Sequence, residues 1–167
     1  MTTIVILAVA VACAAAGCAP SPAPSPSLSS TGFASDAEAF AAAEATYRAY
    51  VDATNARRAD PNSVPDPTDF LTGEAFNDEA TTEAILNDRE WRVVGETTIA
   101  SFRQLRADHD RVELEVCLDS SGTMVLDLAE TDVTPSDRMT IQALSVSFTR
   151  FHSSLLITQS KTSASQC

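Results

Sequence analysis

Residues 112–118, Val-Glu-Leu-Glu-Val-Cys-Leu, decide the fold class of this chain. Apolar and polar side chains alternate along them, which is typical of a β-strand with one face in a core and the other in water. The apolar positions are Val112, Leu114, Val116 and Leu118, and the positions expected on the wet face are Glu113, Glu115 and Cys117. The stretch therefore predicts an antiparallel strand with one face packed on the core and the other face in contact with water.

Further extended segments flank this strand on both sides. Residues 91–105 are rich in β-branched side chains, and the polar turn 107–110 joins them to the strand. After a turn at 119–122 we expect extended structure at 124–128, an alternating strand over 144–149 and a final strand over 155–161. A polar loop around Pro135 precedes the strand over 144–149, and together these segments predict a meander of long antiparallel strands.

Two helical regions precede the strands. Ser35 and Glu38 form a capping box, which predicts a helix start. From there an apolar stripe recurs at helical spacing to about residue 55, at Phe40, Ala43, Tyr47, Tyr50, Val51 and Thr54. A proline-rich loop at 59–67 separates it from a second helical region, 68–88, broken near Gly73. There we expect four side chains on the buried side: Phe76, Ala80, Ala84 and Ile85.

The order of elements, helices first and then strands, predicts an α+β domain. We expect two or three N-terminal helices packed into a curved antiparallel sheet of four to six strands, in a cone-like arrangement. No internal repeat interrupts this order.

The charge of the chain excludes one class of partner. There are 23 acidic and 11 basic side chains, a formal net charge of −12, and no charged side chain precedes Cys18. A surface this acidic repels phosphate backbones at long range. We therefore expect no nucleic-acid partner.

The first eighteen residues resemble the leader of a bacterial lipoprotein. Residues 4–16 are apolar or small and too few to span a bilayer, which fits the core of a signal peptide. Ala15-Ala16-Gly17-Cys18 resembles a lipobox, in which small residues precede the cysteine that receives a diacylglycerol. Ala15 stands where leucine is usual, and the leader has no Lys or Arg; an ordinary secretory signal is the alternative. Cys13 would leave with the leader.

The segment after Cys18 fits a tether. Residues 19–30 contain four prolines and five serines, a composition that cannot bury a core. We therefore divide the chain into a signal peptide (1–17), a Pro/Ser-rich tether (18–34) and a single α+β domain (35–167). The expected location is the outer face of the cell membrane, with the lipid on Cys18 as the membrane partner.

The domain resembles the cone-shaped nuclear transport factor 2-like (cystatin-like) superfamily, and more closely small actinobacterial lipoproteins of that shape. The aromatic stripe around Tyr47 and Tyr50 and the segment Val116-Cys117-Leu118-Asp119 carry this resemblance. Some members of that superfamily have isomerase or dehydratase activity, with an Asp or His base and a Tyr donor. The resemblance therefore implies a pocket, and fold-level analogy alone implies that chemistry.

Two cysteines remain once Cys13 and Cys18 are assigned to the leader and the lipid. Outside the cytoplasm two such thiols tend to pair, so we expect a Cys117–Cys167 disulfide that pins the polar C-terminal tail. A free terminal thiol is the alternative. Two cysteines and two scattered histidines offer no metal-ligand spacing, and no cofactor motif occurs, so we expect neither a metal nor a cofactor.

Weak catalytic candidates are Asp127, Asp119 and Tyr47. Asp127 lies between two leucines, Asp119 begins a Ser-Ser-Gly turn in which Asp commonly caps the backbone, and Tyr47 with Tyr50 fits a core role better. His109 and His152 fall in polar turns and are expected to be solvated. No residue is forced to be an acid or base with a shifted pKa.

The sequence thus favours a non-enzymatic, surface-anchored lipoprotein that binds an unknown protein or small ligand, or supports an envelope assembly. The alternative is a small cone-fold enzyme, isomerase-like or dehydratase-like, that uses an Asp with a Tyr. A two-lobed transporter-binding lipoprotein would need roughly twice this length.

Overall fold

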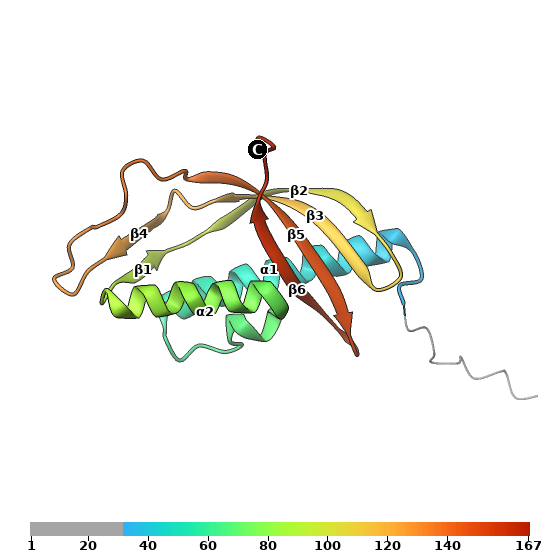
Figure 1. The fold of residues 1–167 in the computed structure, drawn as a ribbon, viewed down its shortest axis with the longest axis horizontal. Coiled ribbons are helices and arrows are strands. Elements are labelled where there is room, and N and C mark those ends of the chain that lie inside the picture. The colour runs from blue at the N-terminus through green and yellow to red at the C-terminus, as the bar shows by residue number, and fades with distance from the viewer. Residues whose placement is uncertain (1–31) are drawn as a thin grey trace, which may run out of the picture.

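Two α-helices and a short 3-10 helix precede six strands in the computed structural model, which describes residues 32–167 (Figure 1). The predicted signal peptide, Cys18 and residues 19–31 of the predicted tether lie outside the described residues. Within 32–167 no helix is long and apolar enough to cross a membrane.

Helix α1 spans Asp36–Ala59 and begins where the capping box predicts. The Ser35 hydroxyl accepts a hydrogen bond from the Glu38 N–H at 3.2 Å. The Glu38 carboxylate accepts from the N–H of Ala34, at 2.7 Å, and not from that of Ser35. Helix α1 continues past the predicted end at residue 55. Arg57 and Arg58 occupy its last turn, where positive charges interact favourably with the negative end of the helix dipole.

A 3-10 helix and helix α2 follow the proline-rich loop. The 3-10 helix spans Pro67–Phe70, and α2 spans Gly73–Asp88, so the predicted break near Gly73 is confirmed. The Thr72 N–H donates to the carbonyl of Ile157 at 2.9 Å. This bond attaches the start of α2 to the last strand of the sheet.

The strands form two antiparallel sheets. In the larger sheet the order is β2 (Thr98–Ala107), β3 (Arg111–Asp119), β5 (Ile141–Phe151) and β6 (Ser154–Thr162). The smaller sheet pairs β1 (Arg92–Gly95) with β4 (Thr123–Leu126) and lies beyond one end of the larger sheet (Figure 1). The predicted α+β fold class is confirmed.

The core lies between α1 and the larger sheet. The alternation in 112–118 is confirmed for the apolar side, because Val112, Leu114 and Val116 are buried opposite Phe148, Val146 and Leu144 of β5. Helix α1 packs on them through Ala39, Ala43, Tyr47 and Val51, whereas Phe40 and Tyr50 of the predicted stripe are only partly buried.

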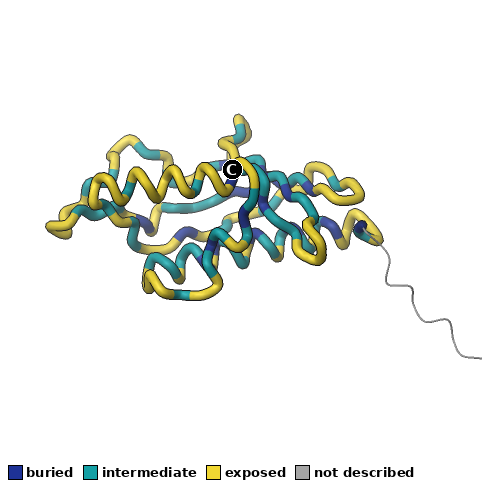
Figure 2. The backbone as a smooth tube through the Cα atoms, turned by 60° about the horizontal axis from the view of Figure 1, so that its bottom comes forward, coloured by how far each residue is buried: buried dark blue, intermediate teal, exposed yellow. Residues whose placement is uncertain are grey.

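Helix α2 is oriented differently from the prediction. Phe76 is 44% exposed and Ile85 is 50% exposed, and Ala80 and Ala84 are also exposed. Instead Ala75 is buried and Glu79 half-buried. Because α1 already fills the inner face of the sheet, α2 packs mainly on β6 and buries only a narrow strip (Figure 2).

Candidate functional site

The two predicted candidate bases, Asp119 and Asp127, cap turns. Asp119 Oδ1 accepts from the N–H of Ser121 at 2.8 Å, and hydrogen bonds from Ser121 lower the pKa of this carboxyl. Asp127 Oδ1 accepts from the N–H groups of Ala129 and Thr131 at 2.9 and 2.8 Å. Among the described residues no hydrogen bond joins either carboxylate to Tyr47, so the expected Asp–Tyr pair is not assembled.

Tyr47 lies in the core, where only 1% of it is exposed. Its ring lies 5.8 Å from that of Tyr50, 6.2 Å from Phe102 and 6.4 Å from Phe148, measured between centroids. Burial raises the pKa of Tyr47 to about 12, although a hydrogen bond with the Ser160 side chain opposes this shift. Tyr47 therefore serves packing, with its hydroxyl group hydrogen-bonded.

Both histidines lie in exposed turns. His109 is in the β2–β3 turn, and its carbonyl accepts a hydrogen bond from the N–H of Phe33 at 3.3 Å. His152 is in the β5–β6 turn, with its ring 4.5 Å from that of Phe151. The structure does not bring the two histidines into a cavity with Tyr47.

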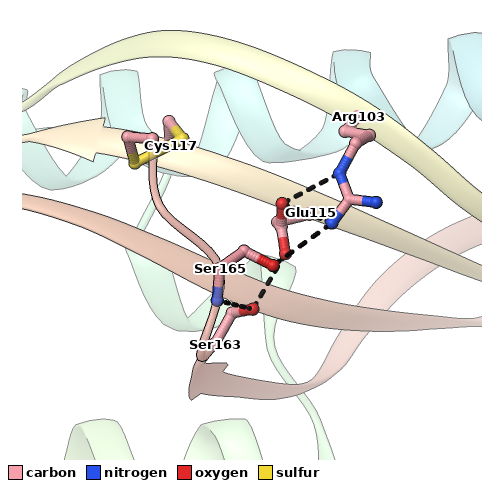
Figure 3. Close-up of a disulfide and its surroundings, with 6 residues drawn as sticks. Arg103, Glu115, Cys117, Ser163 and Ser165 are labelled. Atoms are coloured by element: carbon pink, nitrogen blue, oxygen red, sulfur yellow. Dashed lines mark hydrogen bonds and ion pairs between the residues drawn. A yellow bond between two sulfur atoms is a disulfide. The ribbon is translucent and has the colours of Figure 1, made fainter.

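The outer face of the larger sheet is covered where the sequence predicts a wet face. Cys117 is joined to Cys167 by a disulfide, with 5.5 Å between their Cα atoms (Figure 3). The tail 163–167 therefore lies across β3, leaving Glu115 only 6% and Cys117 only 7% exposed. Alternation predicts which way a side chain points, and it cannot show that a distant segment will cover it.

Glu115 is the centre of a polar network beneath this tail (Figure 3). Arg103 donates to Glu115 Oε1 through Nε and Nη2 at 2.9 and 2.7 Å, and the Ser163 hydroxyl donates to Oε2 at 2.8 Å. Hydrogen bonds from Ser165, Arg103 and Ser163 hold the pKa of Glu115 well below its usual range, at about 2. Because every partner favours the carboxylate, the network fastens the tail and offers no proton donor or acceptor near pH 7.

A groove lies between α1, α2 and β1. Its volume is about 500 Å³. The apolar part of its wall consists of Pro61, Pro67, Leu86, Trp91 and Val93, and the charged part consists of Arg57, Arg58, Glu79, Glu83 and Arg92. A smaller cavity, about 190 Å³, continues it toward Tyr47 and shares Tyr50, Glu79 and Thr82 with it. We call the two together the helix groove.

Glu79 and Tyr50 meet inside the helix groove. The Tyr50 hydroxyl donates to Glu79 Oε2 at 3.5 Å. Burial and the neighbouring charge of Glu83 raise the pKa of Glu79 above its ordinary value. Burial, and next the charge of Glu79, raise the pKa of Tyr50 well above that of a free tyrosine. The pKa values of Glu79 and Tyr50 are thus both shifted away from their ordinary values, which is typical of functional sites.

The arginines of the helix groove are largely engaged. Arg57 forms an ion pair with Asp66 at 2.6 Å, and Arg92 forms one with Glu130. Arg58 donates to Thr97 Oγ1 at 2.9 Å and to Asn55 Oδ1 at 3.3 Å, and burial lowers the pKa of its guanidinium. Neither Glu79 nor Glu83 forms an ion pair with a described residue. Arg58 has only neutral hydrogen-bond partners in the described part of the chain, and its charge opposes the upward pKa shift of Glu79. The lining charges without an ion-pair partner among residues 32–167 are therefore Arg58 on α1 and Glu79 and Glu83 on α2, which leaves an excess of negative charge.

Sequence reasoning missed the helix groove. It assigned the buried side of α2 to its apolar residues, whereas Glu79 lies on the same helical face as Ala75, Thr82 and Leu86. The only signal in the sequence was that a carboxylate shares this face with small and apolar residues, which is a common pattern on solvated helices as well. Trp91 lines the groove from just before β1, and Arg89 lies over its ring at 4.7 Å.

In 32–167 no three His, Cys, Asp or Glu side chains are grouped so that they could hold a metal ion.

Comparisons with known proteins find a likeness at the level of structure. No family model matches the chain, and no curated protein matches it in sequence. Among solved structures, the crystal structure of the intermembrane space region of chloroplast protein ARC6 is similar, with a TM-score of 0.47 and 16% sequence identity. The match covers 74% of this chain and 95% of that one. These comparisons identify no family.

Proposed function

We propose that this chain is an exported lipoprotein, anchored through Cys18, whose domain binds a ligand in the helix groove. The observation that carries the binding role is the groove itself, a cavity of about 500 Å³ with apolar and charged walls, in which the half-buried carboxylate of Glu79 has no ion-pair partner among the described residues. Pockets that combine apolar walls with a few polar groups are the usual form of small-ligand sites.

The disulfide supports the proposed location. Cys117–Cys167 is a bond of the kind that persists in oxidising compartments, which indicates an extracytoplasmic domain. The lipid at Cys18 goes beyond this observation and rests on the leader and on the tether composition. The likeness to the nuclear transport factor 2-like superfamily is likewise a proposal, supported by a long helix that packs along one face of an antiparallel sheet.

The anchor is tested by Cys18→Ala, with Cys13→Ala as the matched control. We expect Cys18→Ala to abolish acylation and to release the protein from the membrane fraction or leave it unprocessed. Cys13→Ala is expected to stay acylated and membrane-bound, because Cys13 lies inside the leader. Mass spectrometry and fractionation measure both. A Cys18→Ala chain processed and membrane-bound like its parent would contradict the anchor.

For the ligand we propose an apolar body with a positive charge. The apolar wall would contact the body, and a cation near Glu79 and Glu83 would offset the burial and the repulsion from Glu83 that raise the pKa of Glu79. The chain's net charge of −12 also raises the local concentration of cations. A small organic amine and the lysine or arginine side chain of a partner protein share this chemistry.

The fluorescence of Trp91 can report ligand binding directly, because Trp91 is the only tryptophan of the chain and lines the helix groove. We expect naphthylmethylamine to change its emission at lower concentrations than naphthylacetate, which has the opposite charge. Glu79→Gln should weaken binding of the amine about tenfold, the size of one charge-assisted hydrogen bond. Glu44→Gln, on α1 and outside the groove, should leave binding unchanged. Equal affinity of amine and carboxylate would contradict the proposed ligand class.

One observation favours a second candidate function, acid–base chemistry. It is the hydrogen bond between Tyr50 and Glu79, with the pKa of Glu79 raised toward the range that a general base needs. This pair would replace the Asp–Tyr pair predicted from sequence. Carbon-13 NMR of the Glu79 carboxyl tests it: Tyr50→Phe should raise the Glu79 pKa further, because the hydrogen bond lowers it. An ordinary pKa at Glu79 would remove the candidate base.

A further inference from the structure

The described chain starts at one end of the molecule, close to the β2–β3 turn and the β5–β6 turn. The N–H of Phe33 donates to the carbonyl of His109 in the β2–β3 turn, and the Arg150 guanidinium lies 4.4 Å from the centre of the Phe33 ring. The N–H of Arg150 donates in turn to the carbonyl of Asp110 at 2.8 Å. We call the region formed by residues 32–36, 106–111 and 150–154 the tether end (Figure 1, right).

Along the chain, the tether end contains the described residues nearest to the proposed anchor, because it starts at Gly32. Residues 19–31 are all that separate Cys18 from Gly32, and a chain of this length reaches at most about 45 Å. Helix α1 starts at this end and is about 36 Å long at 1.5 Å per residue. It leads away toward the helix groove, at the opposite end of the molecule.

The tether end exposes an aromatic side chain at its tip. Phe151 is 61% exposed at the end of β5, directly before the β5–β6 turn. A cavity of about 380 Å³ lies at the same end, and its wall is half apolar, with Phe33, Phe70, Leu155 and Leu156, and half polar, with Asp69 and Arg150 among its residues. An exposed apolar side chain such as Phe gains free energy when it is buried at the boundary between lipid headgroups and acyl chains.

The charge of the tether end differs from that of the whole chain. Its segments 106–111 and 150–154 contain three arginines and two aspartates, and Asp36 of α1 brings their balance to zero. The chain as a whole has a net charge of −12, which repels anionic lipids. Arg150, beside Phe151, forms no ion pair with a described carboxylate and can meet a lipid phosphate.

We propose that the tether end docks on the membrane surface, with Phe151 in the headgroup region and the helix groove facing away from the bilayer. This inference rests on the proposed anchor at Cys18, because a single aromatic side chain binds a bilayer weakly and the tether supplies its high local concentration. Docking would fix the orientation of the domain, so that the groove is presented to partners outside.

Three single-tryptophan reporters test this orientation in the mature lipidated chain, reconstituted in vesicles of phosphatidylcholine and phosphatidylglycerol with brominated acyl chains. The first is Phe151→Trp combined with Trp91→Phe. The second, Leu128→Trp combined with Trp91→Phe, is the matched control, because Leu128 is 72% exposed and follows β4 in the loop that runs beyond the smaller sheet. The third is the native chain, with Trp91 in the groove.

We expect a blue shift and bromine quenching for the tryptophan at 151, and neither for the tryptophans at 128 and 91. Absence of quenching at 151 in a chain that floats with the vesicles would overturn the docking and leave the anchor intact. Quenching at 128 or 91 instead would overturn the proposed orientation. Mass spectrometry of the same preparation reports acylation of Cys18, and a chain without it would contradict the anchor and the docking together.

Discussion

The two faces of the larger sheet are covered in different ways. Helix α1 covers the inner face with apolar side chains and its central aromatic residue, Tyr47. A five-residue tail, 163–167, covers part of the outer face, and a disulfide and the Glu115 network hold it there. The inner cover needs no covalent bond because it buries enough apolar surface by itself, whereas a short polar tail would fray without one.

The largest effect is expected on the inner face, for Tyr47→Ala. Removing a fully buried aromatic side chain leaves a cavity and should lower the free energy of unfolding by about 3–5 kcal/mol, measured by urea denaturation. Tyr47→Phe is the control and should cost only about 1 kcal/mol, because it loses the hydrogen bond with Ser160 and keeps the packing. A loss for Tyr47→Ala no larger than that of its control would break the comparison.

On the outer face the double variant Cys117→Ala/Cys167→Ala should come next. The disulfide closes a loop with a sequence separation of 50, for which the chain-entropy model gives about 4 kcal/mol, and measured values are often lower. Urea denaturation measures the loss, and hydrogen exchange should show residues 163–167 unprotected. If these residues stay protected in the double variant, the tail is held by its polar contacts and not by the disulfide.

Acid should loosen the outer face through Glu115. Its folded-state pKa of about 2 lies below the ordinary value of 4.5, so its stabilisation is complete above pH 4.5 and is lost as the pH falls toward 2. Glu115→Gln should therefore be less stable than the parent at pH 7, by less than the disulfide variant, and show a flatter decline in stability between pH 4.5 and 2. Glu113→Gln, on the same strand, is the control. Identical pH profiles for Glu115→Gln and the parent would contradict the network.

The smallest effect is expected on α2, because its Phe76 covers neither the inner nor the outer face of the larger sheet. With 44% of Phe76 exposed, Phe76→Ala should change the free energy of unfolding by no more than about 0.5 kcal/mol. Ala75, one residue earlier, is buried against the sheet. Ala75→Leu should therefore lower the free energy of unfolding by about 1–3 kcal/mol through overpacking. The reverse order of these two values would show that the predicted orientation of α2 was right after all.

Several elements of the fold could be predicted because their signals are local. The capping box at Ser35 gives the start of α1, the alternation in 112–118 gives β3, and the glycine at 73 marks the start of α2. Each depends on residues within a few positions of one another. The thiol pair Cys117 and Cys167 could be predicted for another reason: with Cys13 and Cys18 assigned elsewhere, no other partner remained.

The candidate site could not be predicted in this way. Asp119, Asp127 and Tyr47 were selected by residue type and local pattern, and the structure uses them for turns and packing. The helix groove depends on where α2 settles once α1 has filled the inner face of the sheet. Glu79, Tyr50 and Trp91 belong to three different elements, and no local pattern brings them together.

The sequence by itself thus determined the order of the elements, the inner face of the sheet and the partners in the disulfide, because each follows from short-range periodicity or from counting thiols. Tertiary structure alone decided which side of α2 is buried and which charges of the helix groove have no ion-pair partner. It also decided that Glu115 is buried, although alternation places Glu115 on the solvent-facing side of β3. These depend on which surface is already occupied when a segment packs. That competition between distant segments leaves no mark in the local pattern of residues.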